Sequence, residues 1–381
     1  MGPQPVHTIV LSGYYGFRNS GDEAVLQSIL LALDEQGKAA GVRIEPVVLS
    51  ADPGWTERTY GVRAVPRMNP AAIWSALKES SGLISGGGSL LQDVTSAKTI
   101  PYYLAVMVMA QWLKKPVFVY SQGVGPVKRR WFHPFIRRVL DKAAYLSVRD
   151  EESAALLRSM GIGRTLDVVP DPVMGLDLPP SSGDGDVEAE GKRPVIGVSV
   201  RYWTKDRSEL RGLAESLERI LQETDAEVRF LPFHLPVDEE ASREMADWIR
   251  GDRDRIRIVT GMEHPQDMLK EIAHCDLVIG MRLHSLIYAA NRLVPMIGIS
   301  YDPKVDQFLN RLGQKPVTGT EPFQSEAVAE ESLRLLRSGC EWKVKHKPMI
   351  EKLKQEAHKP AQQIAAILRQ KERDGRWKSP K

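Results

Sequence analysis

Cationic and imidazole side chains follow four predicted buried strands in the second half of the chain. If those strands are parallel, their carboxyl ends meet at one edge of a sheet, so these side chains converge. An arginine presents a planar fork of donors that fits carboxylate or phosphate, and a lysine adds a compact charge. The pattern predicts a site for a small, multiply anionic molecule. The residues, with the runs they follow, are Arg201 (195–200), His234 (227–233), Arg282 and His284 (276–279) and Lys304 (295–299).

The turn 280–285, with the sequence GMRLHS, is the sharpest of these features. A histidine that titrates near neutral pH in a cationic cleft can give and take protons during a reaction. Because Arg282 lies two residues before it and a helix N-terminus is predicted to follow it, we interpret His284 as functional rather than as a buried structural histidine. For His234, substrate contact and a structural role are equally compatible with the sequence.

Glycine-rich turns follow two predicted strands in the first half. The stretch 13–23 (GYYGFRNSGDE) opens a helix, and 86–93 (GGGSLLQD) is a second such turn, for which a purely structural role is the alternative. Backbone N–H groups in turns of this kind can hold an anion or a sugar. Arg149 follows the predicted strand 145–148 and is expected to point toward the same cleft, unless it pairs with a neighbouring acid.

Other chemical motifs are missing from the sequence. We find no HExxH, paired CxxC, EF-hand, nucleophile-elbow or Walker pattern, and the glycine spacing of 13–23 is not that of a dinucleotide-binding turn. A metal would need the scattered carboxylates Asp22, Asp93 and Asp171. We therefore predict neither a metal nor a cofactor.

The elements that must position these residues form two α/β domains. Short Val- and Ile-rich runs alternate with longer amphipathic stretches, which is typical of βαβ units with parallel sheets. A Pro-, Gly- and acid-rich stretch at 179–193 interrupts the alternation and is predicted to be a linker between domains 1–178 and 194–381. Predicted strands of the first domain are 7–12, 82–85, 116–121, 145–148 and 165–169, and those of the second are 195–200, 227–233, 255–259, 276–279 and 295–299.

Composition narrows the function classes. The net charge of +3 is mild, and 341–381 is the basic part, with 12 Lys and Arg against 5 Asp and Glu. Such a helical tail is most often a solvated face, with an anionic membrane surface as the alternative, and no nucleic-acid-binding module accompanies it. Two cysteines, no signal peptide and no apolar run of about 20 residues predict a cytoplasmic protein.

The stretch 128–138 interleaves cations with aromatic residues. Two interpretations are equally compatible with it. A helix here could lie on the inner leaflet of an anionic membrane. Alternatively, it buries Trp131, Phe135 and Val139 in the domain core.

Six motifs in order resemble those of the polysaccharide pyruvyl transferase family, and most closely its cell-surface-anchoring, CsaB-type members. Each motif is weak alone, but six in this order over nearly the whole chain are specific. The motifs are 13–23 (GYYGFRNSGDE), 86–93 (GGGSLLQD), 121–126 (SQGVGP), 147–151 (SVRDE), 170–173 (PDPV) and 280–285 (GMRLHS).

The resemblance implies two Rossmann-like, doubly wound domains facing a cleft, as in GT-B glycosyltransferases. It implies phosphoenolpyruvate as donor and a sugar as acceptor. For the surface-anchoring branch it implies a 4,6-linked pyruvyl ketal on ManNAc of a lipid-linked ManNAc-GlcNAc precursor of secondary cell wall polymer. S-layer homology domains bind that product.

Residue roles then follow as hypotheses. His284 and Arg149 are assigned to catalysis, with His284 as acid and base, and the predicted acceptor side is the first domain. Phosphoenolpyruvate is assigned to Arg282, Lys304, Arg201 and Ser285. The acceptor is assigned to Gly16, Asn19, Asp22, Gly87, Gly88, Gln92, Asp93 and His234.

Three alternatives stay open on the residues alone. A GT-B glycosyltransferase that uses a nucleotide sugar would bind a uridine nucleotide in the second domain. A non-catalytic sugar-binding or envelope-scaffold protein would not need so many cations. A nicotinamide dehydrogenase would need a different glycine turn.

Overall fold

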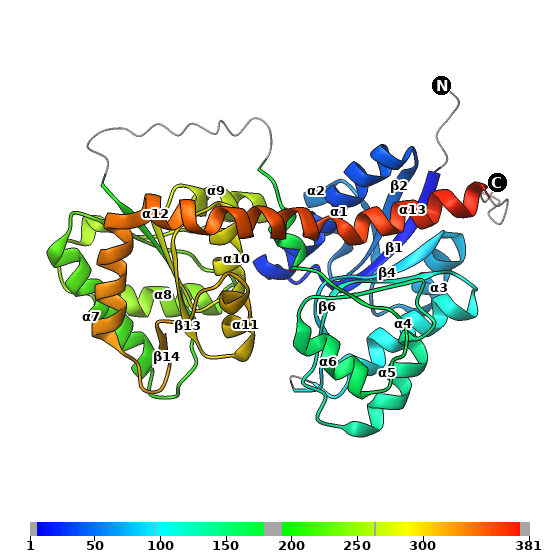
Figure 1. The fold of residues 1–381 in the computed structure, drawn as a ribbon, viewed down its shortest axis with the longest axis horizontal. Helices are drawn as coiled ribbons and strands as arrows, with labels where there is room; N and C mark the ends of the chain where they lie inside the picture. The colour runs from blue at the N-terminus through cyan, green and yellow to red at the C-terminus, as the bar shows by residue number, and fades with distance from the viewer. Residues whose placement is uncertain (1–5, 95, 179–192, 263, 374–381) are drawn as a thin grey trace. The chain divides into compact units, whose positions relative to one another are not determined.

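A computed structural model describes residues 6–94, 96–178, 193–262 and 264–373. The chain divides into two compact units, which are described separately: unit 1 comprises Met1–Leu176 and Leu353–Lys381, and unit 2 comprises Asp177–Lys352. Each unit contains a parallel sheet with helices on both faces (Figure 1). The predicted linker 179–193 lies outside the described residues except for Arg193.

Unit 1 is built on an eight-stranded sheet in the order β3-β2-β1-β4-β6-β7-β8, with β5 pairing to β6. Strands β4, β6 and β7 are buried along their whole length because helices cover both faces. The strands are β1 (Val6–Tyr15), β2 (Arg43–Ser50), β3 (Arg63–Pro66), β4 (Gly82–Ser85), β5 (Gly88–Leu91), β6 (Val117–Val124), β7 (Tyr145–Val148) and β8 (Asp167–Val168).

Alternating residues of β1 serve two cores in unit 1. Val10 packs into a cluster with Leu77, Met107 and Ile136 from the helices of one face, whereas the buried Ile9 and Leu11 point to the other face. The helices are α1 (Ser20–Ala40), α2 (Pro53–Tyr60), α3 (Pro70–Glu79), α4 (Thr99–Trp112), α5 (His133–Leu140) and α6 (Glu151–Ser159), with short 3-10 turns η1 (Arg130–Phe132) and η2 (Pro172–Gly175).

Unit 2 is built on a six-stranded parallel sheet in the order β11-β10-β9-β12-β13-β14. Its strands are β9 (Val195–Ser199), β10 (Glu227–Phe230), β11 (Ile256–Ile258), β12 (Leu277–Gly280), β13 (Met296–Ser300) and β14 (Thr318–Gly319). Its helices are α7 (Ser208–Glu223), α8 (Val237–Trp248), α9 (Pro265–Ala273), α10 (Leu283–Asn291), α11 (Pro303–Arg311) and α12 (Ser325–Ala357), with the 3-10 turn η3 (Arg253–Arg255).

The end of the chain differs from the sequence-based prediction. We expected all of 194–381 to form the second domain, but α13 (Lys359–Arg373) belongs to unit 1, and the unit boundary falls inside α12. Helix α13 packs against α1 and buries Ile364, Ala365 and Leu368. The apolar spacing of α13 predicts an amphipathic helix but cannot say which sheet that helix covers, because burial on either domain needs the same spacing.

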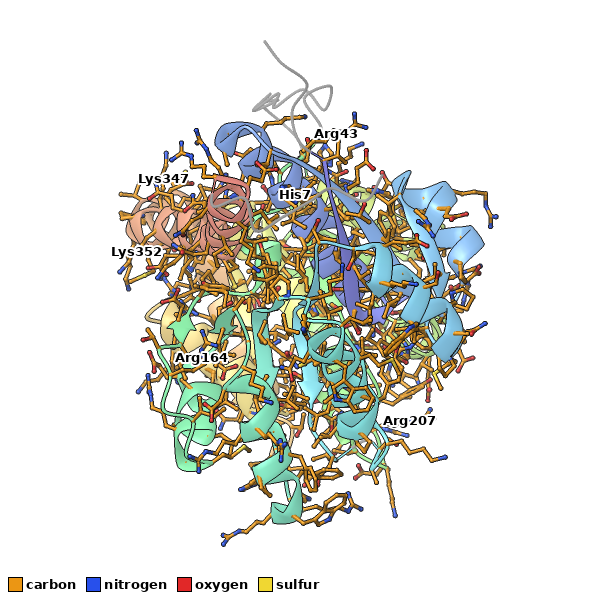
Figure 2. All side chains as sticks on the ribbon, turned by 90° about the vertical axis from the view of Figure 1, so that its right-hand side faces the viewer. His7, Arg43, Arg164, Arg207, Lys347 and Lys352 are labelled. Carbon is orange, nitrogen blue, oxygen red and sulfur yellow. The ribbon has the colours of Figure 1, made fainter. Side chains whose placement is uncertain are left out.

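Charged side chains of the basic tail lie on the outside of its helices. Lys347 and Lys352, labelled in Figure 2, are exposed on α12. By contrast, Glu372 of α13 reaches inward, and its Oε1 lies 2.6 Å from Nε2 of the buried His7. No helix among the described residues is long and apolar enough to cross a membrane.

Candidate functional site

The switch point of unit 2 lies between β9 and β12. The chain leaves β9 toward β10 and leaves β12 toward β13, and ligands of such sheets bind outside the carboxyl ends at this point. Ser199 ends β9 and pairs in register with Gly280, which ends β12. Arg201 and Arg282 each follow two residues later. The register therefore brings two predicted site arginines to the same crevice.

Arg282 is neutralised by an acid that the sequence analysis missed. Its guanidinium forms a two-point ion pair with Asp238, with Nε 2.9 Å from Oδ2 and Nη2 in contact with Oδ1. Asp238 is fully buried in the first turn of α8, and Oδ2 also accepts hydrogen bonds from the backbone N–H groups of Phe233 and His234. This pair ties the turn after β12 to the loop after β10. The acid-rich run 238–240 was the sequence signal for this partner.

Arg201 has no such acid. Its Nη1 donates to the Tyr301 hydroxyl at 3.2 Å, and its guanidinium lies 4.8 Å from the Tyr301 ring centroid and 5.3 Å from that of Trp203. Among the residues that the structure describes, no carboxylate lies within ion-pair distance of Arg201. Aromatic faces compensate a guanidinium only partly. Arg201 thus offers its charge to an anion more readily than Arg282 does.

The pKa of His234 is affected by the charges of both arginines. Desolvation lowers the pKa of His234 from its usual value, and the charges of Arg282 and then Arg201 lower it further, while Asp238 opposes them. A lowered pKa keeps the imidazole neutral near pH 7. A neutral ring can donate one hydrogen bond and accept another, which suits contact with a hydroxylated or anionic ligand.

The other predicted residues of unit 2 lie on helix N-termini. Arg282 is the residue before α10, and His284 is half-buried in the first turn of that helix, where the positive end of the helix dipole favours anions. Ser285 is fully buried, and its Oγ donates to the Arg282 carbonyl at 2.6 Å, so its hydroxyl orders the turn. Lys304 is the second residue of α11, and its Nζ lies 3.4 Å from Asp302.

Arg149 occupies the corresponding edge of unit 1. Its Nε lies 3.5 Å from Asp150, its Nη1 lies 3.5 Å from Asp171, and its Nη2 donates to Ser89 Oγ at 3.3 Å. The side chain lies over Gly123, where a Cβ would come within 2.9 Å of Nη2. Arg149 therefore does pair with neighbouring acids, which was the alternative prediction for this residue. The arginine nevertheless joins the end of β7 to β5 through Ser89 and to the start of η2 through Asp171.

The turn 13–23 is ordered by a buried acid. Glu23 accepts from the backbone N–H of Gly16 at 2.8 Å, and Tyr60 donates to its other oxygen at 3.0 Å. Asn19 caps α1 by accepting from Gly21 N–H. Gly16 has φ +80°, and a Cβ there would lie 2.1 Å from Ser50 Oγ. Gly16 and Asn19, which we predicted to bind the acceptor, are therefore also required for the conformation of this turn.

Residues of the second glycine turn lie beside the first. Gly86 N–H donates to Ser12 O at 2.8 Å, which joins the ends of β4 and β1. A Cβ on Gly87 would come within 2.9 Å of Val25 in α1, so this turn packs closely on that helix. Gly88 has φ +87°, and its Cβ position is 3.2 Å from Oδ1 of the half-buried Asp22. Asp22, Gly87 and Gly88 are thus brought together.

Gln92 and Asp93 organise the next loop. Gln92 Oε1 accepts from Val94 N–H at 2.8 Å. The buried Asp93 carboxylate accepts from the backbone N–H groups of Lys128 and Arg129, each at 2.8 Å. Desolvation raises the pKa of Asp93, but these hydrogen bonds and the charge of Arg129 outweigh it and lower the pKa from its usual value. Asp93 therefore anchors the stretch 128–138.

That stretch does not bury its aromatic residues as the second interpretation required. Trp131 is 58% exposed and Phe135 is 56% exposed, whereas Phe132, Ile136 and Val139 are buried. The Trp131 and Phe135 ring centroids are 6.3 Å apart. The turn η1 and helix α5 are thus held by their apolar sides and leave two large rings exposed, next to a segment that contains the exposed Lys128 and Arg130.

Comparison with solved structures shows the fold. A putative UDP-N-acetylglucosamine 2-epimerase from Listeria monocytogenes is 15% identical with a TM-score of 0.60 and covers 100% of this chain and 99% of its own. Sucrose-phosphate synthase from Thermosynechococcus elongatus is 13% identical with a TM-score of 0.57, over 98% of this chain and 100% of its own. The predicted fold class, two Rossmann-like α/β domains of the GT-B type, is confirmed.

Comparison of sequences is more specific. The amylovoran biosynthesis protein AmsJ of Erwinia amylovora is 23% identical over 261 residues, which span 62% of this chain and only 60% of AmsJ. The family model described as polysaccharide pyruvyl transferase matches residues 19–303, which contain five of the six motifs and residues 19–23 of the remaining motif 13–23. The chain belongs to the polysaccharide pyruvyl transferase family.

Proposed function

We propose that this protein transfers pyruvyl from phosphoenolpyruvate to a sugar and releases phosphate. The acceptor would be ManNAc in a lipid-linked ManNAc-GlcNAc precursor of secondary cell wall polymer, and the product a 4,6-O-ketal that supports S-layer anchoring, as in CsaB-type members. Family membership supports pyruvyl transfer. The observation that carries the donor assignment is Arg201, a guanidinium without an acid partner among the described residues, at the switch point of unit 2.

Phosphoenolpyruvate brings a carboxylate and a phosphate to one small molecule. Arg201 supplies an uncompensated charge, and Arg282 supplies a charge that Asp238 partly offsets. The N-terminus of α10 adds backbone donors, and Lys304 adds a further cation at the N-terminus of α11. The donor thus has two anionic groups, and the site has two arginines that differ in how far their charge is compensated. We assign the anionic group that becomes more negative during the reaction to Arg201, whose charge is the less compensated.

The reaction needs balanced proton transfers. A sugar hydroxyl adds to C2 of phosphoenolpyruvate and loses its proton while C3 gains one, which turns the methylene into a methyl group. The C2–O bond to phosphate then breaks, and the second hydroxyl attacks C2 and gives up its proton as the ketal closes. We assign proton transfer to His284, whose place in the first turn of α10 is next to the donor arginines. Arg149 would stabilise negative charge.

The acceptor would bind to unit 1. Asp22, Gly87 and Gly88 lie together at the carboxyl edge of its sheet, and a carboxylate there can accept hydrogen bonds from sugar hydroxyls. Gln92 and Asp93 would act by ordering the neighbouring loop.

A phosphate-release assay with phosphoenolpyruvate and a ManNAc-GlcNAc acceptor tests this function, with mass spectrometry of the product. His284→Ala should lower kcat by about 10² to 10⁴. The matched control is His274→Ala, because His274 is exposed at the C-terminal end of α9 and outside the proposed site. Near-normal turnover of His284→Ala would refute the assignment. Saturable binding of a uridine nucleotide, without phosphate release, would support a glycosyltransferase instead.

We also propose that the stretch 128–138 contacts the anionic inner leaflet of the membrane, where a lipid-linked acceptor resides. The exposed rings of Trp131 and Phe135 suit the interface, and Lys128, Arg129 and Arg130 suit lipid headgroups. A hollow of about 430 Å³ between α5 and the end of α6 is lined by residues that include His133, Arg137 and Arg138.

Co-sedimentation with phosphatidylglycerol vesicles tests this contact. Each cation near such a surface contributes about 1 kcal/mol, so replacing Lys128, Arg129 and Arg130 should weaken binding about 100-fold. Trp131→Ser should weaken it as well, whereas Trp112→Ser should not, although Trp112 is 73% exposed on α4. Unchanged binding of the triple variant would contradict the membrane contact.

A further inference from the structure

Two aromatic rings stand exposed where β1 ends in unit 1. Tyr14 is 39% exposed and Phe17 is 41% exposed. The rings are stacked, with centroids 4.0 Å apart and planes inclined by 8°. Two large rings exposed side by side are costly to leave in water, and such patches usually mark a binding surface.

The loop that carries these rings is rigid. Glu23 is 1% exposed and accepts hydrogen bonds from the backbone N–H groups of Gly16 and Arg18, one on each side of Phe17. Arg18 has φ +57°, and its guanidinium lies 3.4 Å from Asp52. The rings are therefore held in place before any ligand arrives, which lowers the entropic cost of binding.

The guanidinium of a buried arginine packs against both rings of the pair. Arg67 is 8% exposed, and its guanidinium lies 5.8 Å from the Tyr14 centroid and 5.1 Å from that of Phe17. The ring centroids of Tyr102 and Tyr103 lie 4.6 Å and 5.7 Å from the same guanidinium. Arg67 donates to Gly13 O at 3.1 Å and pairs with no carboxylate among the described residues. Its compensation comes from the rings.

The position of the pair identifies the kind of ligand. Strands β1 and β4 pair at Ser12 and Ser85, and the strand order of unit 1 reverses between them, so the rings border the ligand crevice of this sheet. Asp22 acts electrostatically on Tyr14 and raises the pKa of its hydroxyl, after desolvation as the larger cause. An aromatic face beside a carboxylate fits a molecule with an apolar C–H face and hydroxyls at its rim. A pyranose ring has that chemistry.

We propose that Tyr14 and Phe17 form a platform on which a pyranose ring of the acceptor stacks, with Asp22 accepting hydrogen bonds from its hydroxyls and Arg67 fixing the platform. This inference rests on the proposed function for the identity of the acceptor. It adds a binding site whose residues determine the affinity for the acceptor and not the affinity for phosphoenolpyruvate.

Steady-state kinetics of the full chain tests the platform with phosphoenolpyruvate and a ManNAc-GlcNAc glycoside. Tyr14→Ala and Phe17→Ala should each raise the KM for the glycoside about tenfold, which corresponds to about 1.4 kcal/mol. The KM for phosphoenolpyruvate should stay within about twofold, and Tyr14→Phe should retain wild-type KM because it keeps the ring. Trp74→Ala is the matched control, since Trp74 is 40% exposed on α3.

A binding measurement separates failure of the platform from failure of the proposed function. Saturation-transfer NMR with the same glycoside needs no turnover, and its signal should be strong with wild type and lost with the double variant Tyr14→Ala/Phe17→Ala. A lost signal supports the platform even if no phosphate is released. Equal signals from both proteins, whether strong or absent, would overturn it, as would an unchanged KM for the glycoside in an active enzyme.

Discussion

Replacing Arg201 and Arg282 in turn separates an arginine whose charge is available to an anion from one that also closes a structural ion pair. Among the described residues, the guanidinium of Arg201 has a hydroxyl and two rings as partners and no carboxylate, whereas Arg282 closes an ion pair with the fully buried Asp238. Arg201→Ala should reduce kcat/KM for phosphoenolpyruvate and leave the melting temperature nearly unchanged. Arg282→Ala should lower the melting temperature, because it leaves a buried carboxylate without its cation.

The magnitudes follow from the two environments. Two unit charges about 4 Å apart interact by about 4 kcal/mol at an effective dielectric constant of about 20. Because Arg201 is partly exposed, we take the value for a charged hydrogen bond, about 1.5–3 kcal/mol, which is a loss of about 10- to 150-fold in kcat/KM. For Arg282→Ala the unpaired Asp238 costs about 3–5 kcal/mol, or about 6–20 °C for a unit of this size.

Phosphate-release kinetics and scanning calorimetry measure both effects on the same preparations. The double variant Asp238→Asn/Arg282→Met is the control, because it removes both charges and should recover part of the melting temperature lost in Arg282→Ala. If Arg201→Ala kept kcat/KM within about twofold, the charge at the switch point would not bind the donor. If Arg282→Ala melted like wild type, the structural role of its pair with Asp238 would be wrong.

Three further predictions concern stability. Glu23→Ala should lower the melting temperature by several degrees, because backbone N–H groups of Gly16 and Arg18 lose their acceptor at about 1–3 kcal/mol each; calorimetry would show no shift if Glu23 were dispensable. Gly16→Ala should destabilise far more than Gly41→Ala, since φ is +80° and +74° but a Cβ meets Ser50 Oγ only at Gly16; equal urea midpoints would contradict this. The free energy of unfolding should fall as pH drops below 6.5, because the lowered pKa of His234 means that the unfolded state binds the proton first, and the fall should be smaller in His234→Gln.

The strand-to-helix turn 280–285 shows how accurately the apolar periodicity of the sequence predicts the ends of strands and helices. The predicted strand 276–279 is β12 shifted by one residue, and α10 begins at Leu283, just before His284 rather than after it. The predicted strands 82–85 and 145–148 coincide with β4 and β7, because continuous apolar runs bounded by turn residues leave little choice. Strands β2 and β3 were not predicted, because charged residues and a proline interrupt the apolar pattern in each of them; β3 is the edge strand and β2 lies next to it.

Sequence order by itself determined the motifs, the family, the two α/β domains and the ends of the strands that carry Arg201 and Arg282. Tertiary structure alone decided which of these charges are compensated: Asp238 lies 44 residues before Arg282, and Arg67 lies 50 residues beyond Phe17. It also decided that α13 covers the first sheet and that Trp131 and Phe135 face outward. The physical reason is that spacing reports local periodicity, whereas ion pairing and burial depend on which segments of the chain meet in space.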